Sequence, residues 1–279
     1  MVIGHTKQLK YFKNLIKNDT LGHAYLFTGP EMIGKKTFAL ELAKSIFGEV
    51  EQNQDFKFIE PKIADEETKL YIEDIRDLRR FLSFKSYNGG WRIVLINNAH
   101  SLTNEAANAF LKILEEPPSD STIILISSVS GLLPATILSR CEEVKFLPLN
   151  NREISDFVSQ NKKLNKEDKD FLIKISGGRI GLIKNIIDSG DLAKIKASID
   201  DLRKLLNRGI FERMEYAKKM YESEKYTETA SYWLHWISAH LASSPKNKKI
   251  VENLLALNQL ISQPQYNHRL ALENFLLNL

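Results

Sequence analysis

In the first half of the chain, short apolar runs alternate with stretches whose apolar residues recur at helical spacing. The short runs are rich in branched and aromatic residues and are bounded by polar ones, which indicates buried strands. Four such runs lie at residues 23–28, 93–96, 123–126 and 144–147. Between them, amphipathic patterns predict helices near residues 1–20, 38–46, 72–84 and 103–116. The polar region at residues 48–69 contains a mixed run, 55–63, that is a candidate for one further strand. Strands that alternate with helices predict an α/β domain with a mainly parallel sheet.

After Pro148 the pattern changes to helices alone. Three short apolar stripes come first, and a polar stretch at residues 188–191 reads as a linker. Beyond it, a clear 3.6-residue period predicts four or five helices whose aromatic residues form a bundle core. We therefore expect three domains, at residues 1–147, 148–190 and 191–279.

Composition narrows the class of protein. Among the 279 residues there is one cysteine, which excludes an internal disulfide and any zinc site of three or four cysteines. No apolar run approaches the roughly 20 residues of a membrane span, and the N-terminus lacks a signal-peptide core. We expect a cytoplasmic protein without a membrane partner. The net charge of +4 permits a basic face without requiring one.

A glycine-rich loop follows the first predicted strand and precedes a helix, which is the context of a phosphate-binding loop. Residues 29–37 nearly match G-x-x-x-x-G-K-[ST], with Gly29, Gly34 and Lys35 in place. Lys36 stands where a magnesium-binding hydroxyl belongs, and Thr37 lies one residue late, turned by about 100° around the helix. Two interpretations stay open: a modified site that binds ATP, or a vestigial loop that keeps only the shape. In either case we expect no magnesium held in the usual way and no required cofactor.

The second predicted strand ends in two asparagines. In a P-loop hydrolase, Asn97 and Asn98 would be a magnesium-holding acid and a water-activating acid. An amide cannot act as a general base and does not neutralise a divalent cation, so the pair predicts no ATP hydrolysis. His100 is the imaginable replacement base, but a lone histidine at a strand end is more often structural.

Several segments together resemble the AAA+ clamp-loader family of bacterial DNA polymerase III, and in particular its delta-prime branch. They cover nearly the whole chain, and the combination of EEPP with a downstream Ser-Arg-Cys is highly specific. The segments are HAYLFTGP (23–30), IEDIRDL (72–78), NNAHSLTNEAANAFLKILEEPP (97–118), Ser139-Arg140-Cys141, Gly178-Arg179 and NHRLALENFLLNL (267–279).

This resemblance implies an α/β P-loop (AAA+) domain, a small helical lid and an all-α collar that joins a five-subunit ring. It implies that Arg140 is an arginine finger acting in trans and that Arg179 is the second-sensor arginine of the lid. The implied partners are gamma/tau and delta subunits, the sliding clamp and, through the complex, primer–template DNA. The chain would be a subunit of a nucleotidyltransferase assembly without ATPase activity of its own.

Alternative interpretations remain. From spacing alone, Arg140 is a solvated surface arginine. An active gamma/tau-type ATPase is a second candidate, but it would be expected to keep both acids and the loop hydroxyl. A stand-alone DNA-binding regulator is a third, although no basic helix-turn-helix is recognisable. Many relatives carry a four-cysteine zinc module after the first helix of the P-loop domain, whereas residues 48–69 contain no cysteine here.

Overall fold

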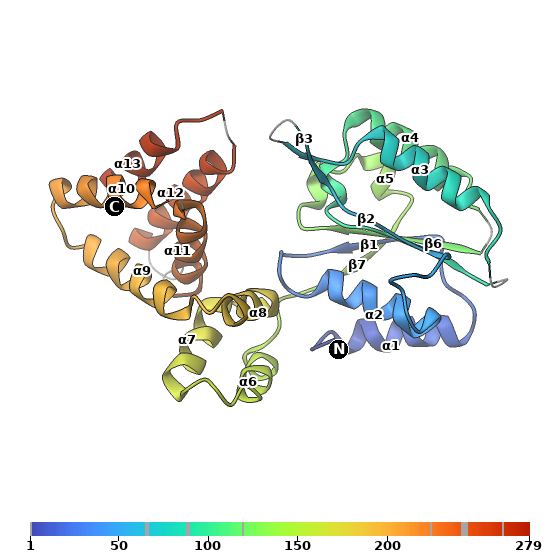
Figure 1. Cartoon of the computed structure of the whole chain (residues 1–279), viewed down its shortest axis with the longest axis horizontal. Coiled ribbons are helices and arrows are strands. Elements are labelled where there is room, and N and C mark those ends of the chain that lie inside the picture. Colours follow the sequence, from blue (N-terminus) through green and yellow to red (C-terminus); the bar gives the residue numbers. More distant parts are fainter. Residues whose placement is uncertain are drawn as a thin grey trace. The chain divides into compact units, whose positions relative to one another are not determined.

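The computed structural model of the chain describes residues 2–64, 67–87, 90–118, 120–223, 225–240, 245–263 and 265–279. The chain divides into two compact units, Met1–Leu149 and Asn150–Leu279 (Figure 1). The described strands all belong to the first unit, and the second is helical. The further division that we expect near residue 190 stays a prediction.

The first unit is built on a sheet of five strands in the order β2-β5-β6-β1-β7. Each neighbouring pair is parallel, with Leu26 opposite Leu125, for example, and Val94 opposite Ile123. The carboxyl ends of the five strands therefore share one edge of the sheet, which confirms the predicted parallel α/β fold. The strands are β1 (Ala24–Thr28), β2 (Phe56–Ile59), β5 (Arg92–Ile96), β6 (Ser121–Ser127) and β7 (Glu142–Lys145).

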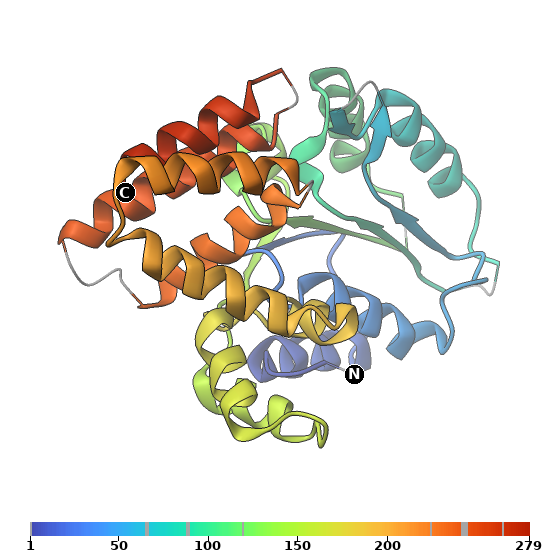
Figure 2. The same cartoon turned by 60° about the vertical axis from the view of Figure 1, so that its left-hand side comes forward.

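Helices cover both faces of this sheet. The turned view of Figure 2 shows α1 and α2 on one face, with α3, α4 and α5 on the other. Successive strand side chains alternate between the layers: Phe27 packs against Phe12 and Phe38, whereas Leu26 belongs to the cluster of Phe110. The helices are α1 (Thr6–Lys17), α2 (Lys35–Phe47), α3 (Ile72–Ser83), α4 (Asn104–Glu115) and α5 (Ala135–Leu138).

Local details depart from the sequence expectations in two places. The polar region after α2 holds more than the one strand considered there, because β3 (Lys62–Ala64) and β4 (Glu67–Lys69) form an antiparallel hairpin after β2. The last strand of the sheet begins two residues earlier than predicted, and Leu147, expected inside it, is 70% exposed. Short 3₁₀ turns, η1 (Ala99–Ser101) and η2 (Ser130–Leu132), follow β5 and β6.

The second unit is a helical assembly with an aromatic core. Trp233 is fully buried, stacks on Tyr216 at 6.0 Å between ring centroids and donates its Nε1–H to the Ser198 carbonyl at 2.9 Å. This confirms the aromatic stripe as bundle core. The helices are α6 (Asn151–Ser159), α7 (Lys166–Ser176), α8 (Ile180–Ser189), α9 (Leu192–Leu205), α10 (Ile210–Glu222), α11 (Tyr226–His240), α12 (Pro245–Ile261) and α13 (His268–Leu277).

Candidate functional site

The carboxyl edge of the sheet gathers the residues that follow each strand. The glycine loop follows β1, Glu60 follows β2, Asn97 and Asn98 follow β5, and Ser128 follows β6. In parallel sheets this edge is where ligands bind. The parallel order thus brings the predicted loop and the two asparagines into one region.

Backbone geometry forces glycine at two positions of the loop. Gly29 has φ +133°, and a Cβ there would overlap the carbonyl oxygen of Phe146. Gly34 caps α2 with φ 104°. His5, ahead of α1, hydrogen-bonds the Ile33 carbonyl through Nε2 at 2.8 Å, so the first helix is anchored to the loop. No motif in the sequence indicates this role of His5.

Lys35 is turned into its own loop. Its Nζ donates to the carbonyls of Gly29 at 2.5 Å and Pro30 at 2.6 Å, and the side chain is buried. Burial lowers the pKa of Lys35 to about 8, with Glu31 acting in the opposite direction. The ammonium group that would face phosphate oxygens is thus engaged by backbone oxygens of the loop.

Lys36 and Asn97 both hydrogen-bond the carboxylate of Glu60, a residue that the sequence motifs did not indicate. Glu60 Oε1 accepts from Lys36 Nζ at 2.6 Å and from Asn97 Nδ2 at 3.0 Å. Lys36 also lies 4.6 Å from the centroid of the Phe58 ring. The available signal was the position of Glu60, directly after a strand on the ligand-binding edge.

These residues do not form the ligand set of a magnesium-bound nucleotide. Magnesium takes oxygen ligands in near-octahedral geometry. Position 36 instead supplies an ammonium, and Asn97 turns its amide nitrogen to Glu60. Asn98 caps η1 in the left-handed region with φ 49°, and Thr37 is exposed on α2. Among the described residues no cluster of three or more His, Cys, Asp or Glu side chains could hold a metal ion.

His100 contacts the neighbouring strand rather than the loop. Its Nδ1 lies 3.2 Å from Ser127 Oγ at the end of β6. Burial lowers the pKa of His100; the charge of Glu31 acts in the opposite direction, and the charge of Lys35 lowers the pKa further. Next to it, Ser128 Oγ donates to Glu31 Oε1 at 3.1 Å. These bonds tie β6 to η1 and to the loop.

Arg140 lies between α5 and β7, and α4 and α5 hold its guanidinium. Nη1 donates to the Thr136 carbonyl at 3.0 Å, and Nη2 donates to Glu115 Oε1 at 2.8 Å. The side chain stays 36% exposed. Cys141 packs against the core beside it, where burial raises the pKa of the thiol to about 11 and keeps it protonated.

Arg140 is separated from the loop of its own chain by the length of a strand. It precedes the amino end of β7, which runs parallel to β1, with Tyr25 opposite Glu142 and Thr28 opposite Lys145. The loop follows the carboxyl end of β1. Four strand residues span about 13 Å, so the two features lie at opposite edges of the sheet.

Arg179 belongs to the second unit and is described there by itself. It precedes α8, and its backbone N–H donates to the Ser176 carbonyl at 3.0 Å. Gly177 and Gly178 before it have φ of 52° and 83°, in the left-handed region that favours glycine. The side chain is partly buried.

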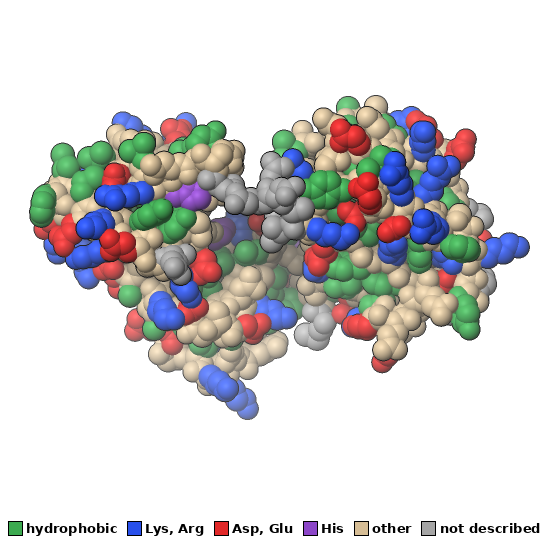
Figure 3. Space-filling view, turned by 45° about the horizontal axis from the view of Figure 1, so that its top comes forward, with side chains coloured by type: hydrophobic (Ala, Val, Ile, Leu, Met, Phe, Trp, Pro, Cys, Tyr) green, Lys and Arg blue, Asp and Glu red, His purple; other side chains and the backbone are tan. Residues whose placement is uncertain are grey.

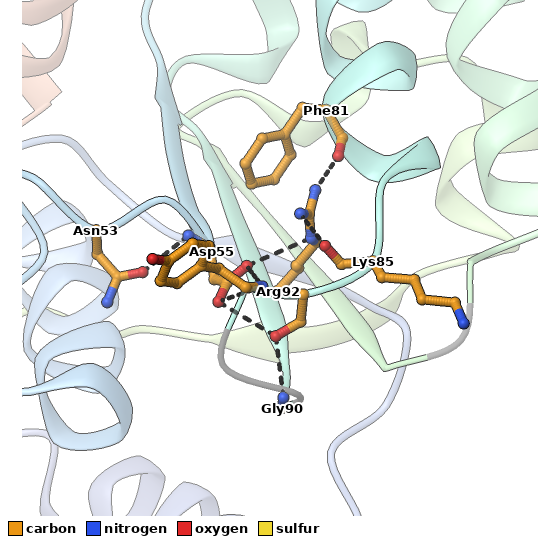
Figure 4. Close-up of polar contacts among 8 residues, drawn as sticks. Asn53, Asp55, Phe81, Lys85, Gly90 and Arg92 are labelled. Atoms are coloured by element: carbon orange, nitrogen blue, oxygen red, sulfur yellow. Dashed lines mark hydrogen bonds and ion pairs between the residues drawn. The ribbon is translucent and has the colours of Figure 1, made fainter.

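A second polar cluster lies at the amino ends of β2 and β5 (Figure 4). Asp55 and Arg92 are both buried and form an ion pair with 3.5 Å between Oδ1 and Nε. Arg92 donates to the carbonyls of Phe81 and Lys85, and Asp55 accepts from the Tyr87 N–H at 2.9 Å. The cluster fastens the segment after α3 to the sheet, and we assign it a structural role.

Charges on the rest of the surface are mixed. On the face drawn in Figure 3, basic side chains lie beside acidic ones on each unit. On α3, Arg76 and Arg80 pair with Glu73 and Asp77 of the same helix at 3.7 and 3.8 Å. In the part of the chain that is described, no helix is both long and apolar enough to cross a bilayer.

Comparisons with known proteins match this fold. DNA polymerase III subunit tau/gamma of Haemophilus influenzae is 30% identical over 209 residues, which cover 69% of this chain and 30% of that protein. Subunit delta′ of Bacillus subtilis is 33% identical over 161 residues, covering 53% and 49%. The matched part is therefore at most about half of either relative's length.

A solved structure and a family model agree with these relatives. A DNA polymerase III, gamma subunit-related protein of Thermotoga maritima superposes with a TM-score of 0.58 at 21% identity, over 95% of this chain and 97% of that one. The family model described as "DNA polymerase III, delta subunit" matches residues 4–150, more than half of the chain. Because this model matches more than half of its length, the chain belongs to this family of DNA polymerase III clamp-loader proteins.

Proposed function

We propose that this chain is a non-hydrolysing, delta-prime type of clamp-loader subunit in DNA replication. It supplies Arg140 to ATP bound on a neighbouring gamma/tau-type subunit. The observation that carries the proposal is the place of Arg140, partly exposed at the sheet edge opposite the glycine loop of its own chain. From there the guanidinium cannot serve its own loop, but it can serve another chain.

The chemistry of the arginine side chain suits this role. A guanidinium is always charged and offers several N–H donors in a planar fork that matches phosphate oxygens. Charge develops on the γ-phosphoryl group as it is transferred, and an arginine provided by a neighbour stabilises that charge. Two of the five N–H groups of Arg140 bind Thr136 and Glu115, which leaves donors for a phosphate.

The residues at the loop support the absence of hydrolysis. Lys36 and Asn97 both bind Glu60 where a magnesium ion and its ligands would be needed. Neither asparagine can act as a base. In this proposal the partners are gamma/tau and delta subunits, with the sliding clamp and primer–template DNA reached through the complex, and the chain itself requires no cofactor.

The test is ATP turnover by the complex reconstituted with gamma/tau and delta subunits. We expect no turnover by the isolated chain and at least a tenfold lower kcat in the complex that carries Arg140→Ala, since a trans arginine contributes about 10³-fold or more in other systems. Arg152→Ala, an exposed arginine on α6, is the matched control and should leave turnover unchanged. Unaltered turnover with Arg140→Ala would reject the role, and turnover by the chain alone would favour the active gamma/tau-type ATPase.

A further inference from the structure

We infer that Glu115 is a positioning residue for Arg140. This inference rests on the proposed function and adds a second residue to it. Glu115 is the last residue of α4, and its Oε1 lies 2.8 Å from Arg140 Nη2. Its carboxylate therefore meets the guanidinium of a residue 25 positions further along the chain.

The packing of α4 against α5 fixes both ends of this contact. Phe110 and Ile113 of α4 and Ile137 of α5 are buried in the same core cluster. Two prolines follow α4 at positions 117 and 118 and prevent its continuation, so Glu115 stays on the last helical turn. The pair thus stands on two elements that the core holds together.

Two acceptors hold the guanidinium at different nitrogens. The Thr136 carbonyl takes Nη1 at 3.0 Å, and Glu115 takes Nη2. One contact alone would allow the planar group to rotate about it, whereas two define its orientation. Two of the five N–H groups are therefore engaged within the part of the chain that the structure describes, and the others can serve a ligand.

The expected benefit is preorganisation. An arginine has a long, flexible side chain, and holding it before the phosphate arrives removes part of the entropy that binding would otherwise cost. The pair is partly exposed, with the Glu115 side chain 50% accessible, so solvent and salt screen the carboxylate. Glu115 can orient the guanidinium without cancelling its charge at the phosphate.

Glu116 provides a matched control. It is the next residue, it carries the same carboxylate and it is exposed, but it caps the end of α4, and among the described residues the partners of the Arg140 guanidinium are Thr136 and Glu115. If the loss of negative charge at the end of α4 were the cause, Glu115→Ala and Glu116→Ala would change turnover alike. If the orientation of Arg140 were the cause, only Glu115→Ala would change turnover.

The experiment compares variants of the full chain in the reconstituted complex. We expect Glu115→Ala to lower kcat for ATP by about threefold to tenfold with KM unchanged, because the finger acts in the transition state. Glu115→Gln, which keeps an acceptor oxygen, should retain most of the turnover, and Glu116→Ala should behave as wild type. In the Arg140→Ala background, Glu115→Ala should have no further effect.

Each contrary outcome has its own meaning. Unaltered turnover with Arg140→Ala rejects the proposed function itself. Reduced turnover with Arg140→Ala but wild-type turnover with Glu115→Ala overturns only the positioning role. Faster turnover with Glu115→Ala also overturns it, because Glu115 would then restrain the arginine. A further loss in the Arg140→Ala background would also overturn it, because Glu115 would then act through another group. The unfolding temperature of each variant is the folding control: equal values show that no loss of turnover comes from misfolding.

Discussion

Two adjacent lysines at the glycine loop have opposite environments. Lys35 is buried and bound by backbone carbonyls, whereas Lys36 is exposed and bound by the Glu60 carboxylate. The charge of Lys35 lies in a buried position, whereas the charge of Lys36 is exposed to solvent. Burial therefore distinguishes these two lysines, although they are adjacent in the chain.

A pH dependence follows for Lys35. Its pKa is lowered from the ordinary value of 10.5 to about 8, so between these values the unfolded chain keeps a proton that the folded chain has lost. Where the unfolded state binds more protons, stability rises with pH. We expect the free energy of unfolding of the wild type, relative to Lys35→Met, to increase between pH 8 and pH 10. Urea unfolding at both values measures it, and a constant or shrinking difference would contradict the assignment.

At the scale of elements, the alternation of apolar and polar residues predicted four of the five strands of the sheet and the helices α1 to α4, whereas β2 lies in a mixed run without a clear pattern. Runs such as 93–96 and 123–126 became central strands because both faces of each are covered. The hairpin of β3 and β4 was missed because each strand has only three residues, too few to show a hydrophobic period. The predicted start of a helix near residue 103 is confirmed: Thr103 is the N-cap of α4, and its Oγ1 accepts from the Ala106 N–H at 3.2 Å.

The candidate site was less predictable than the fold. The motif located Lys35, Lys36 and Asn97, but it did not reveal that Glu60 joins two of them. Glu115 lay inside a recognised segment without an assigned role, because its partner is 25 residues away. Such contacts depend on how the helices and strands pack together, which residue spacing along the chain does not reveal.

The fastening of the segment after α3 gives a prediction on stability. Asp55→Ala removes one partner of a buried ion pair and leaves Arg92 and the Tyr87 N–H without the carboxylate. We expect a loss of about 3 kcal/mol in the free energy of unfolding. Asp77→Ala, which breaks the exposed pair with Arg80, should cost about 1 kcal/mol or less. Urea denaturation of both variants tests this, and equal losses would argue against a structural role of the buried pair.

At the scale of the whole molecule, the first unit contains its own core. Both hydrophobic clusters that sandwich the sheet consist of residues between Phe12 and Phe146. A domain of this size buries enough apolar surface to be stable alone. The helical unit has a separate aromatic core around Trp233.

We therefore expect a fragment of residues 1–149 to fold by itself. Its circular dichroism should show mixed helix and strand, and its thermal unfolding should be a single cooperative transition. A chain that lacks cooperative unfolding would mean that the cores of the sheet unit depend on the helical one. The Asp55→Ala fragment serves as a destabilised reference.

Arg140 and the glycine loop lie at opposite edges of the sheet, so the sheet unit offers an arginine at one edge and a nucleotide-type loop at the other. A subunit that both binds ATP and offers an arginine can be followed and preceded by others, so such subunits can form a row of any length. In an assembly built on the proposed contact, a chain that does not hydrolyse ATP, and whose Lys35 binds the carbonyls of its own loop, can give an arginine but has no use for one. Such a chain closes a row at one end. The number of working ATP sites in the assembly then equals the number of ATP-binding subunits that have a neighbour offering an arginine, and the position of this chain at the end of the row sets that number.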